Sequence, residues 1–501
     1  MGLLGVDGFM IDVEADLSQG LPGFDVVGLP GTAVRESRDR VRAAMKNCGF
    51  SYPVSRITVN LAPADVKKEG SVYDLPLLVA LLKASDQLSG VPDSAAFLGE
   101  LSLTGEVRPV RGVLPMVIAA RDAGMQEVFV PAENAAEGAV VEGITVYPVA
   151  HILALVEHLV GSHPLAPAVY TQAHAPLASV PDFEDVMGQH AARRAMEIAA
   201  AGSHNILLIG PPGSGKSMLA KRLPSILPDL SPAEALEATK IHSIAGALPG
   251  GVGLLAQRPF RSPHHNISAP GLAGGGSVPR PGEVSLAHHG VLFLDELPEF
   301  SRTAMESLRQ PLEDRKVVIS RVSASLEYPC SFMLVAAMNP CPCGFYGHPT
   351  RACTCSPKAA SQYLSRISGP LLDRVDLHIE VPPVEFDELA SKQKGESSAA
   401  IKERVNAARR IQQERYQGTS IISNAHIPAD TIKKVCPLTE AASQLLKNAF
   451  ERMGLSARAY DRLLKVSRTI ADLDGSDILD VKHVAEAVQY RGLDRKYWQR
   501  G

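Results

Sequence analysis

An eight-residue stretch near the middle of the chain constrains the fold more than any other feature. Residues 210–217 read GPPGSGKS, which matches the phosphate-binding pattern G-x-x-x-x-G-K-[ST]. The stretch follows the apolar run NILLIG and precedes MLAKRL, as a strand-loop-helix nucleotide fold requires. A glycine-rich turn with a chance lysine would also fit the pattern, but the flanking strand and helix favour a phosphate loop. The predicted ATP-binding residues are Gly210, Pro211, Pro212, Gly213, Ser214, Gly215, Lys216 and Ser217.

Two further apolar runs supply the polar groups that such a site needs. The run VLFLDE ends in Asp295 and Glu296, and FMLVAAMN ends in Asn339. Ligands gather at the carboxyl ends of buried parallel strands. We therefore expect Asp295 to bind Mg²⁺ with Ser217, and Glu296 to orient and deprotonate the attacking water. The amide of Asn339 is suited to holding the same water, so the pattern predicts ATP hydrolysis and not only binding.

The composition places the chain among globular proteins with more than one domain. Its 501 residues exceed what one hydrophobic core usually organises, and 45% are hydrophobic while 21% are charged. The N-terminal sequence lacks the basic and apolar regions of a signal peptide, and charges, Gly or Pro interrupt every apolar run before it could span a bilayer. We expect a cytoplasmic protein with no membrane partner.

Changes in sequence character predict an α/β fold class with three parts. Residues 1–161 alternate β-rich and helical runs, and residues 162–183 are rich in Pro, Ala and Ser, as in a linker. Residues 184–385 contain the P-loop and its strands, which predicts a parallel-sheet ATPase core. Residues 386–501 are helical in period and predict a helical lid.

These features, in this order, resemble an AAA+ ATPase of the magnesium-chelatase-like YifB/ComM family. The resemblance covers the chain through phrases such as GLPGFDVVGLPGTAVRESRDRVRAA, FRSPHHNIS, PRPGEVSLAHHGVLFLDELPEF and NPCPCGFYG. It implies that Arg374, in GPLLDRVDL, is an arginine finger for the γ-phosphate of the neighbouring subunit, and that Arg458 is sensor 2. Arg366 is a rival finger, and either role could instead be a structural ion pair. A finger supplied to a neighbour requires a ring, which the family leads us to expect as a homo-hexamer.

The same resemblance identifies two insertions expected to face the pore of the ring. One contains Arg280, and the other is a predicted β-hairpin that turns near Ser323 and contains Arg321. Both arginines could contact a DNA backbone, or they could brace the hairpins. The net charge of −4 and the 5% aromatic content exclude a basic coat and a base-stacking platform, so any DNA contact is local. The adjacent pairs His264–His265 and His288–His289 could suggest a metal site, but neighbours on a strand point to opposite faces, so we interpret them as strand residues with structural or interface roles.

Four cysteines follow Asn339 closely. Cys341, Cys343, Cys353 and Cys355 form C-x-C-x9-C-x-C, and four thiolates fit tetrahedral Zn²⁺. The C-x-C spacing is tighter than usual, so reduced buried thiols are the alternative, and His348 is a spare ligand. The sequence predicts a possible structural zinc.

The first 161 residues resemble the proteolytic domain of Lon but lack its catalytic pair. By that resemblance Val72 or its neighbour stands where the nucleophilic serine would fall, and Leu114 and Pro115 stand where the lysine base would fall. Ser71 has no base in register to activate it. We interpret this part as a module for assembly or DNA engagement.

Three functions compete for this sequence. The resemblance favours a ring motor on single-stranded or branched DNA, a branch-migration helicase acting in recombination and natural transformation. A chelatase-type ATPase that remodels a protein partner is the second hypothesis, and an ATP-dependent protease is the third. Translocation polarity and the preferred DNA structure do not follow from the residues.

Overall fold

The computed structural model describes residues 1–171, 180–276, 279–320, 325–348, 350–384 and 394–498. They form two compact units, of which the first comprises residues 1–176, 231–256 and 320–328 within these limits. The second comprises residues 177–230, 257–319 and 329–501. Among the described residues, no helix combines the length and apolar composition that crossing a bilayer requires.

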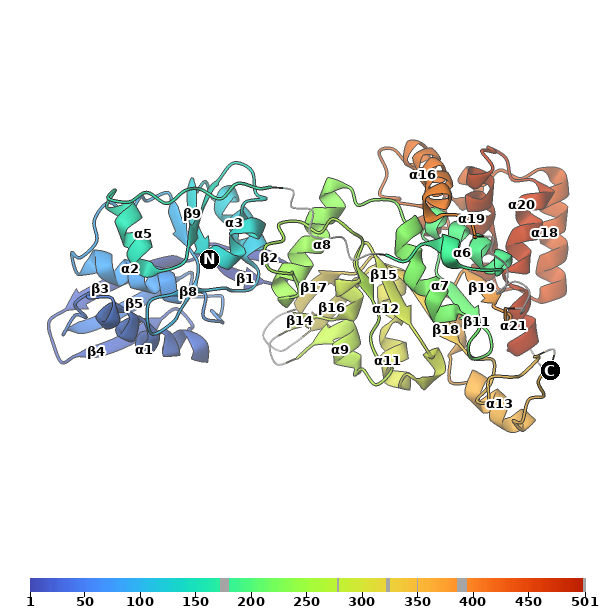
Figure 1. Ribbon diagram of the computed structural model, residues 1–501, viewed down its shortest axis with the longest axis horizontal. Coiled ribbons are helices and arrows are strands. Elements are labelled where there is room, and N and C mark those ends of the chain that lie inside the picture. Colours follow the sequence, from blue (N-terminus) through green and yellow to red (C-terminus); the bar gives the residue numbers. More distant parts are fainter. Residues whose placement is uncertain (172–179, 277–278, 321–324, 349, 385–393, 499–501) are drawn as a thin grey trace. The chain divides into compact units, whose positions relative to one another are not determined.

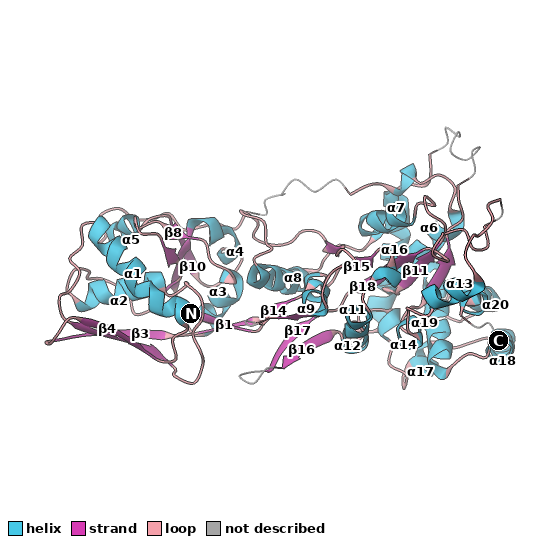
Figure 2. Ribbon diagram, turned by 90° about the horizontal axis from the view of Figure 1, so that it is seen from below, coloured by secondary structure: helices cyan, strands magenta, loops and turns pink. Residues whose placement is uncertain are grey.

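The first unit is an α/β domain built on two small sheets (Figure 1). Strands β3, β4 and β5 form one sheet in the order β3-β5-β4, and β6, β9 and β10 form a parallel sheet in the order β10-β9-β6. Helices α1 and α2 cover one face of the first sheet (Figure 2). Strands of this unit are β1 (Gly2–Leu4), β2 (Asp7–Phe9), β3 (Asp12–Ser18), β4 (Gly23–Val27), β5 (Arg56–Ala62), β6 (Ala95–Phe97), β7 (Glu100–Leu101), β8 (Val107–Arg108), β9 (Glu127–Pro131) and β10 (Thr145–Val149). Its helices are α1 (Thr32–Asn47), α2 (Asp74–Ala84), α3 (Val113–Asp122), α4 (Ala135–Gly138), α5 (Ile152–Leu159) and α8 (Pro232–Ala245).

Helix α8 belongs to this first unit although its sequence lies beyond the P-loop. A capping box between Ser231 and Glu234 starts the helix, and Gly246 ends it in the left-handed conformation. Ser243 donates a hydrogen bond of 2.6 Å to the Glu137 carboxylate, and burial raises the pKa of Glu137. The sequence-based division had placed residues 231–256 and 320–328 within the ATPase core, whereas their contacts are with the first unit.

The second unit contains a five-stranded, all-parallel sheet in the order β12-β15-β18-β11-β19. Strands β11 (Ile206–Ile209), β15 (Val291–Leu294) and β18 (Met333–Met338) are buried along their full length, as strands covered on both faces should be. The flanking strands are β12 (Phe260–Arg261) and β19 (Leu377–Glu380), and β13 (Gly274–Gly275) pairs with β14 (Arg280–Pro281). β16 (Lys316–Ser320) and β17 (Ser325–Pro329) form another two-stranded sheet, of which residues 325–328 are grouped with the first unit. The predicted parallel P-loop core is confirmed.

Helices follow the sheet in the last hundred residues. Amphipathic helices pack their apolar faces into one core with α6, as the 3.6-residue period of the sequence predicts. Helices of this unit are α6 (His190–Gly202), α7 (Lys216–Arg222), α9 (Ala269–Ala273), α10 (Glu283–Leu286), α11 (Arg302–Ser307), α12 (Arg309–Asp314), α13 (Pro357–Leu364), α14 (Gly369–Leu372), α16 (Ser398–Arg415), α17 (Ile432–Val435), α18 (Glu440–Met453), α19 (Ala457–Leu473), α20 (Val481–Gln489) and α21 (Gly492–Tyr497).

Candidate functional site

The predicted phosphate loop joins β11 to α7 and has the backbone that such a loop needs. Gly213 and Gly215 adopt φ values of +77° and +89°. Residues that carry a Cβ rarely adopt such angles. A Cβ at Gly210 would lie 2.2 Å from the carbonyl oxygen of Val381, so this position also accepts only glycine. The first turn of α7 begins at Lys216, so its free backbone N–H groups face the loop. Gly210 through Ser217 are thus arranged as one phosphate-binding turn.

Lys216 is buried and held at the end of this loop. Its Nζ donates hydrogen bonds of 2.8 Å to the carbonyl oxygens of Gly210 and Pro211, and one of 3.2 Å to Asn339 Oδ1. Burial lowers the pKa of Lys216 to about 8, against the opposing attraction of Asp295 and Glu296. The loss of hydration disfavours the charged ammonium, and a bound phosphate would restore its stabilisation. A pKa of about 8 leaves the lysine mostly protonated at pH 7, so it can bind phosphate as an ammonium.

Asp295 and Ser217 form the predicted magnesium pair. Ser217 Oγ donates a 2.6 Å hydrogen bond to Asp295 Oδ2, although the two residues come from different elements. A hydroxyl and a carboxylate oxygen at this separation are the hard ligands that Mg²⁺ prefers beside substrate phosphates. These residues fit the ion, which when bound neutralises phosphate charge. Strands β15 and β11 bring both oxygens to the carboxyl edge of the sheet.

Glu296 lies immediately beyond the magnesium pair and is accessible. Its side chain is 56% exposed, and its backbone is in the left-handed region at φ 52°. Its N–H donates to Asp295 Oδ1 at 2.9 Å, and its carboxylate lies 3.4 Å from His265 Nδ1. The turn that follows β15 thus separates the two carboxylates, leaving Glu296 able to accept a proton while Asp295 faces Ser217.

The sequence interpretation missed the contact between His265 and Glu296. The paired histidines were expected on strands, but all four lie outside strands, and the rings of each pair are 4.1 Å and 3.9 Å apart between centroids. The strand interpretation was therefore wrong. His265 follows β12, which pairs with β15, so the position of this histidine relative to a neighbouring strand end was the signal available.

Arg374 and Arg458 line one cavity of about 450 Å³, whose lining includes none of the P-loop residues, Asp295, Glu296 or Asn339. Arg374 is 9% exposed and pairs with Glu313, a contact that lowers the pKa of the Glu313 carboxyl. Arg458 is exposed on the first turn of α19. Arg315, Arg462 and Lys465 also line the cavity, so its cationic side chains outnumber the carboxylates of Glu313 and Asp376.

Two guanidinium groups of this cavity have unused donors. Arg374 Nε and Arg462 Nη1 are buried without a hydrogen-bond partner among the described residues. Burial lowers the pKa of Arg462 despite the nearby carboxylate of Asp376. Buried N–H groups without partners are costly, so these two guanidinium groups are incompletely satisfied in this arrangement of the side chains.

The cavity lies at the amino ends of the strands, whereas the P-loop lies at their carboxyl ends. Asn205, which precedes β11, donates from Nδ2 to the Arg374 carbonyl at 2.9 Å and accepts from the Leu334 N–H at 2.8 Å. The N–H of Asp376, which precedes β19, donates to the Asn205 carbonyl at 2.9 Å. Four residues of β11 separate Asn205 from the P-loop, a length of about 13 Å.

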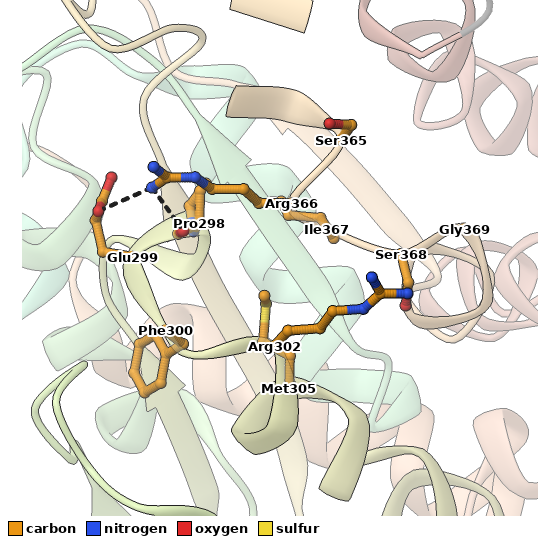
Figure 3. A pocket seen from close by; sticks show the side chains of 10 residues that line it. All are labelled: Pro298, Glu299, Phe300, Arg302, Met305, Ser365, Arg366, Ile367, Ser368 and Gly369. Carbon is orange, nitrogen blue, oxygen red and sulfur yellow. Dashed lines mark hydrogen bonds and ion pairs between the residues drawn. The ribbon is translucent and has the colours of Figure 1, made fainter. Parts of the chain in front are cut away.

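Arg366, the alternative candidate for the arginine finger, has different neighbours from Arg374. Arg366 is 53% exposed and donates to Glu299 Oε2 at 3.0 Å and to the Pro298 carbonyl at 3.3 Å (Figure 3). These contacts connect it to the turn that follows β15, at the carboxyl edge of the sheet. Arg366 therefore lies on the side of the sheet that holds the chain's own P-loop, opposite to Arg374.

Of the two arginines predicted to contact DNA, only Arg280 lies among the described residues. Arg280 is exposed on the short strand β14. Arg321 lies outside the described residues, between the ends of β16 and β17. The predicted hairpin strands are present on either side of it.

The four cysteines of the predicted metal site come together. Cys341, Cys343, Cys353 and Cys355 have all their Sγ atoms within 4.8 Å of one another. His348 is not part of this group, and its Nδ1 accepts hydrogen bonds from the Thr350 and Arg351 N–H groups. The spare-ligand interpretation of His348 is therefore not supported by its position.

The peptidase positions of the first unit carry no catalytic pair. Val72 and Leu114 are buried apolar residues, and Ser71 donates its hydroxyl to the Glu100 carboxylate. Lys68 is buried nearby, but its Nζ donates to the Pro63 carbonyl. No lysine among these contacts is positioned to activate Ser71.

Comparison with known proteins places this chain in a family. The model of magnesium chelatase, subunit ChlI, matches residues 182–389, and models of the ChlI subunit and of its C-terminal part match residues 13–134 and 395–491. The chain is 47% identical to YifB of Escherichia coli (strain K12) over 98% of this chain and 96% of that protein. It is 44% identical to the competence protein ComM of Haemophilus influenzae over the same shares.

The chain belongs to the YifB/ComM family of magnesium-chelatase-like AAA+ ATPases. The resemblance on which the sequence interpretation depended is thereby confirmed. A shorter match, 29% identity over 140 residues, is to the Lon protease of Mycolicibacterium smegmatis and covers 27% of this chain and 18% of that enzyme. Membership of the AAA+ family implies ATP and Mg²⁺ as substrate and cofactor.

The lowered pKa of Lys216 predicts how ATP binding by this AAA+ ATPase depends on pH. Phosphate binding needs the protonated lysine, so affinity is nearly full at pH 7 and falls through a midpoint near pH 8 as the ammonium of the free protein loses its proton. We expect the dissociation constant for a fluorescent ATP analogue to rise about tenfold between pH 7 and pH 9. Lys216→Arg should bind more weakly with little change over this range, because guanidinium stays protonated. An equally flat profile in the unaltered protein would contradict the assignment.

Proposed function

We propose that this protein is an ATP-driven motor that assembles as a homo-hexameric ring and translocates on DNA. Within this proposal it is a branch-migration helicase that acts in recombination during natural transformation. Its substrates are ATP and single-stranded or branched DNA, its ion is Mg²⁺, and it works in the cytoplasm. A structural Zn²⁺ in the four-cysteine cluster completes the proposed set of cofactors.

One observation carries the ring proposal: Arg374 and Arg458 share a cavity at the opposite edge of the sheet from the P-loop. Neither guanidinium can serve the nucleotide of its own chain without crossing the sheet. A head-to-tail assembly solves this, since the amino edge of one subunit can meet the carboxyl edge of the next.

The proposed roles of the residues follow from the same geometry. Lys216 and the backbone of residues 210–217 bind the phosphates, while Ser217 and Asp295 hold Mg²⁺. Glu296 takes the proton of the attacking water, and Asn339 orients that water beside Lys216. Arg374 of the neighbouring subunit, assisted by its Arg458, stabilises the charge that grows on the γ-phosphate.

DNA as the polymer is supported by two features. The relative ComM is named a competence protein, and Arg280 presents an exposed cation on a short hairpin. A ring repeats each such cation once per subunit, so a few arginines suffice to follow a phosphate backbone even though the whole chain has a net charge of −4. Arg280 and Arg321 are the proposed contacts.

We expect single-stranded or forked DNA to stimulate ATP hydrolysis, and Arg280→Ala to weaken DNA binding. A plot of log affinity against log salt concentration has a negative slope. Each lost phosphate contact makes this slope less steep by about 0.7, or by roughly 4 when six subunits each lose one contact. The measurement is fluorescence anisotropy of labelled single strands at several salt concentrations. Arg452→Ala, on the exposed face of α18, is the matched control, and Lys216→Ala is the blank for stimulation. Equal salt slopes for Arg280→Ala and Arg452→Ala would contradict the contact.

The magnesium-chelatase match favours a second candidate, an ATPase that remodels a protein partner. Its ATPase rate would be indifferent to DNA of any structure and would respond only to that partner. An ATP-dependent protease is the weakest candidate, because Val72 and Leu114 occupy the catalytic positions implied by the Lon resemblance. Absence of casein cleavage with ATP present is the expected result.

A further inference from the structure

The cysteine cluster has the dimensions of a four-thiolate metal site. Three Sγ–Sγ separations are 3.4, 3.7 and 3.5 Å, and Cys355 Sγ accepts the Cys343 N–H at 3.3 Å. Four sulfurs at about 2.3 Å from a tetrahedral Zn²⁺ lie about 3.8 Å apart. A disulfide needs about 2.05 Å, so these Sγ–Sγ separations match a shared ion and not a covalent bond.

The loop that carries these cysteines needs a stabilising element. Apart from residue 349, which is not described, residues 339–356 contain no helix or strand. Ordering such a length of chain costs conformational entropy, and here little regular hydrogen bonding offsets that cost. A metal that ties residues 341–355 at four points supplies the missing stabilisation.

This loop contacts the nucleotide site at two points. Asn339, two residues before Cys341, accepts the 3.2 Å hydrogen bond of Lys216. Gly344 lies so close to the P-loop that a Cβ on it would be 2.4 Å from Pro212 Cδ. The first half of the cysteine loop therefore packs directly against the P-loop.

A third contact joins the second half of the loop to Asn339. Helix α13 begins at Pro357, two residues after the last cysteine; burial raises the pKa of its Tyr363 hydroxyl, and the nearby backbone of Asn339 partly opposes that rise in pKa. Residues on both sides of the cluster are thus connected to the end of β18. Closing the cluster fixes their separation.

We propose that Zn²⁺ bound by Cys341, Cys343, Cys353 and Cys355 braces Asn339 and the P-loop, so that nucleotide binding depends on zinc. The inference rests on the proposed ATPase function and adds a second metal that supports the site without touching ATP. Without zinc, Gly344 and Asn339 lose their fixed positions against Pro212 and Lys216. The brace is a positioning device, and no cysteine takes part in hydrolysis.

The test uses the full-length protein and needs no DNA. We expect about one zinc per subunit by plasma mass spectrometry, and less than a tenth of that in a Cys343→Ser, Cys353→Ser double variant. Binding of a fluorescent ATP analogue should weaken at least roughly tenfold in the double variant, because a small displacement of positioning groups is costly. Circular dichroism separates this from global unfolding.

Two glycine variants isolate the contact from the metal. Gly344 and Gly347 both have left-handed backbones, at φ +83° and +75°, so alanine strains each similarly. A Cβ at Gly344 meets Pro212, whereas at Gly347 its nearest neighbour is Lys496 Cε at 3.8 Å. Gly344→Ala should keep its zinc and lose ATP affinity, and Gly347→Ala should keep both.

Several results would overturn the brace. They are thiols or disulfides without zinc in protein purified under reducing conditions, unchanged ATP affinity in the zinc-free variant, or equal effects of the two glycine substitutions. Full zinc content in a protein that binds no ATP would instead overturn the proposed ATPase function. The two failures are therefore distinguishable.

Discussion

Replacing Arg374 by alanine should lower the rate of ATP hydrolysis about 10³-fold or more. An arginine that stabilises charge on the transferring phosphoryl group contributes 10³–10⁵ to the rate in related phosphoryl-transfer enzymes. The ATP analogue should still bind, because Lys216 and the P-loop of the same chain are untouched. The measurement is steady-state phosphate release at saturating ATP, together with analogue binding.

Two other variants show whether this loss is specific. Arg366→Ala removes the exposed rival finger, which pairs with Glu299, and should change the rate by no more than a few-fold. Glu313→Gln removes the charge that holds Arg374 within its own chain, and should leave hydrolysis largely intact. If Arg374 only braced the fold, Glu313→Gln would reduce stability and activity as Arg374→Ala does.

Glu296→Gln should lower turnover about 10²–10⁴-fold while sparing ATP binding. General base catalysis contributes about 10²–10⁴ to a rate, and glutamine cannot accept the proton of the attacking water. The amide keeps the size of the side chain, so Ser217, Asp295 and Lys216 should retain their contacts. Lys216→Ala is the contrast, since it should lose both binding and turnover. A rate for Glu296→Gln within a few-fold of the unaltered protein would contradict the assignment of the base.

The nucleotide edge of the sheet was predictable from local sequence. The three apolar runs that precede the P-loop, Asp295 and Asn339 each form a buried strand, and Asp295 and Asn339 meet Ser217 and Lys216 at one edge. This succeeds because parallel strands share a direction, so the residue after each strand has only one edge on which to lie. The family resemblance then identified Arg374 and Arg458 as candidates.

The opposite edge was not predictable in the same way. The cavity shared by Arg374 and Arg458 depends on how α19 packs beside the strands, and the ion pair of Arg374 with Glu313 depends on α12. Neither contact has a local signature. The contact of His265 with Glu296 likewise required the pairing of β12 with β15.

Segments inserted into the ATPase sequence show a further limit of predicting domain boundaries from sequence order. Residues 231–256 follow the P-loop helix in sequence, yet the hydrogen bond between Ser243 and Glu137 helps hold them in the first unit. Sequence order divides a chain into continuous parts, whereas tertiary packing does not. The cysteine pattern predicted its own clustering but not the contact of Gly344 with Pro212.

Mixing two inactive variants tests the central claim, that each ATP site is completed by a neighbouring subunit. In random rings of Glu296→Gln and Arg374→Ala subunits, about one interface in four joins an intact Glu296 to an intact Arg374. We therefore expect an equimolar mixture to recover up to about a quarter of the unaltered rate of phosphate release. A mixture that assembles into rings but remains as inactive as either variant alone would contradict the account.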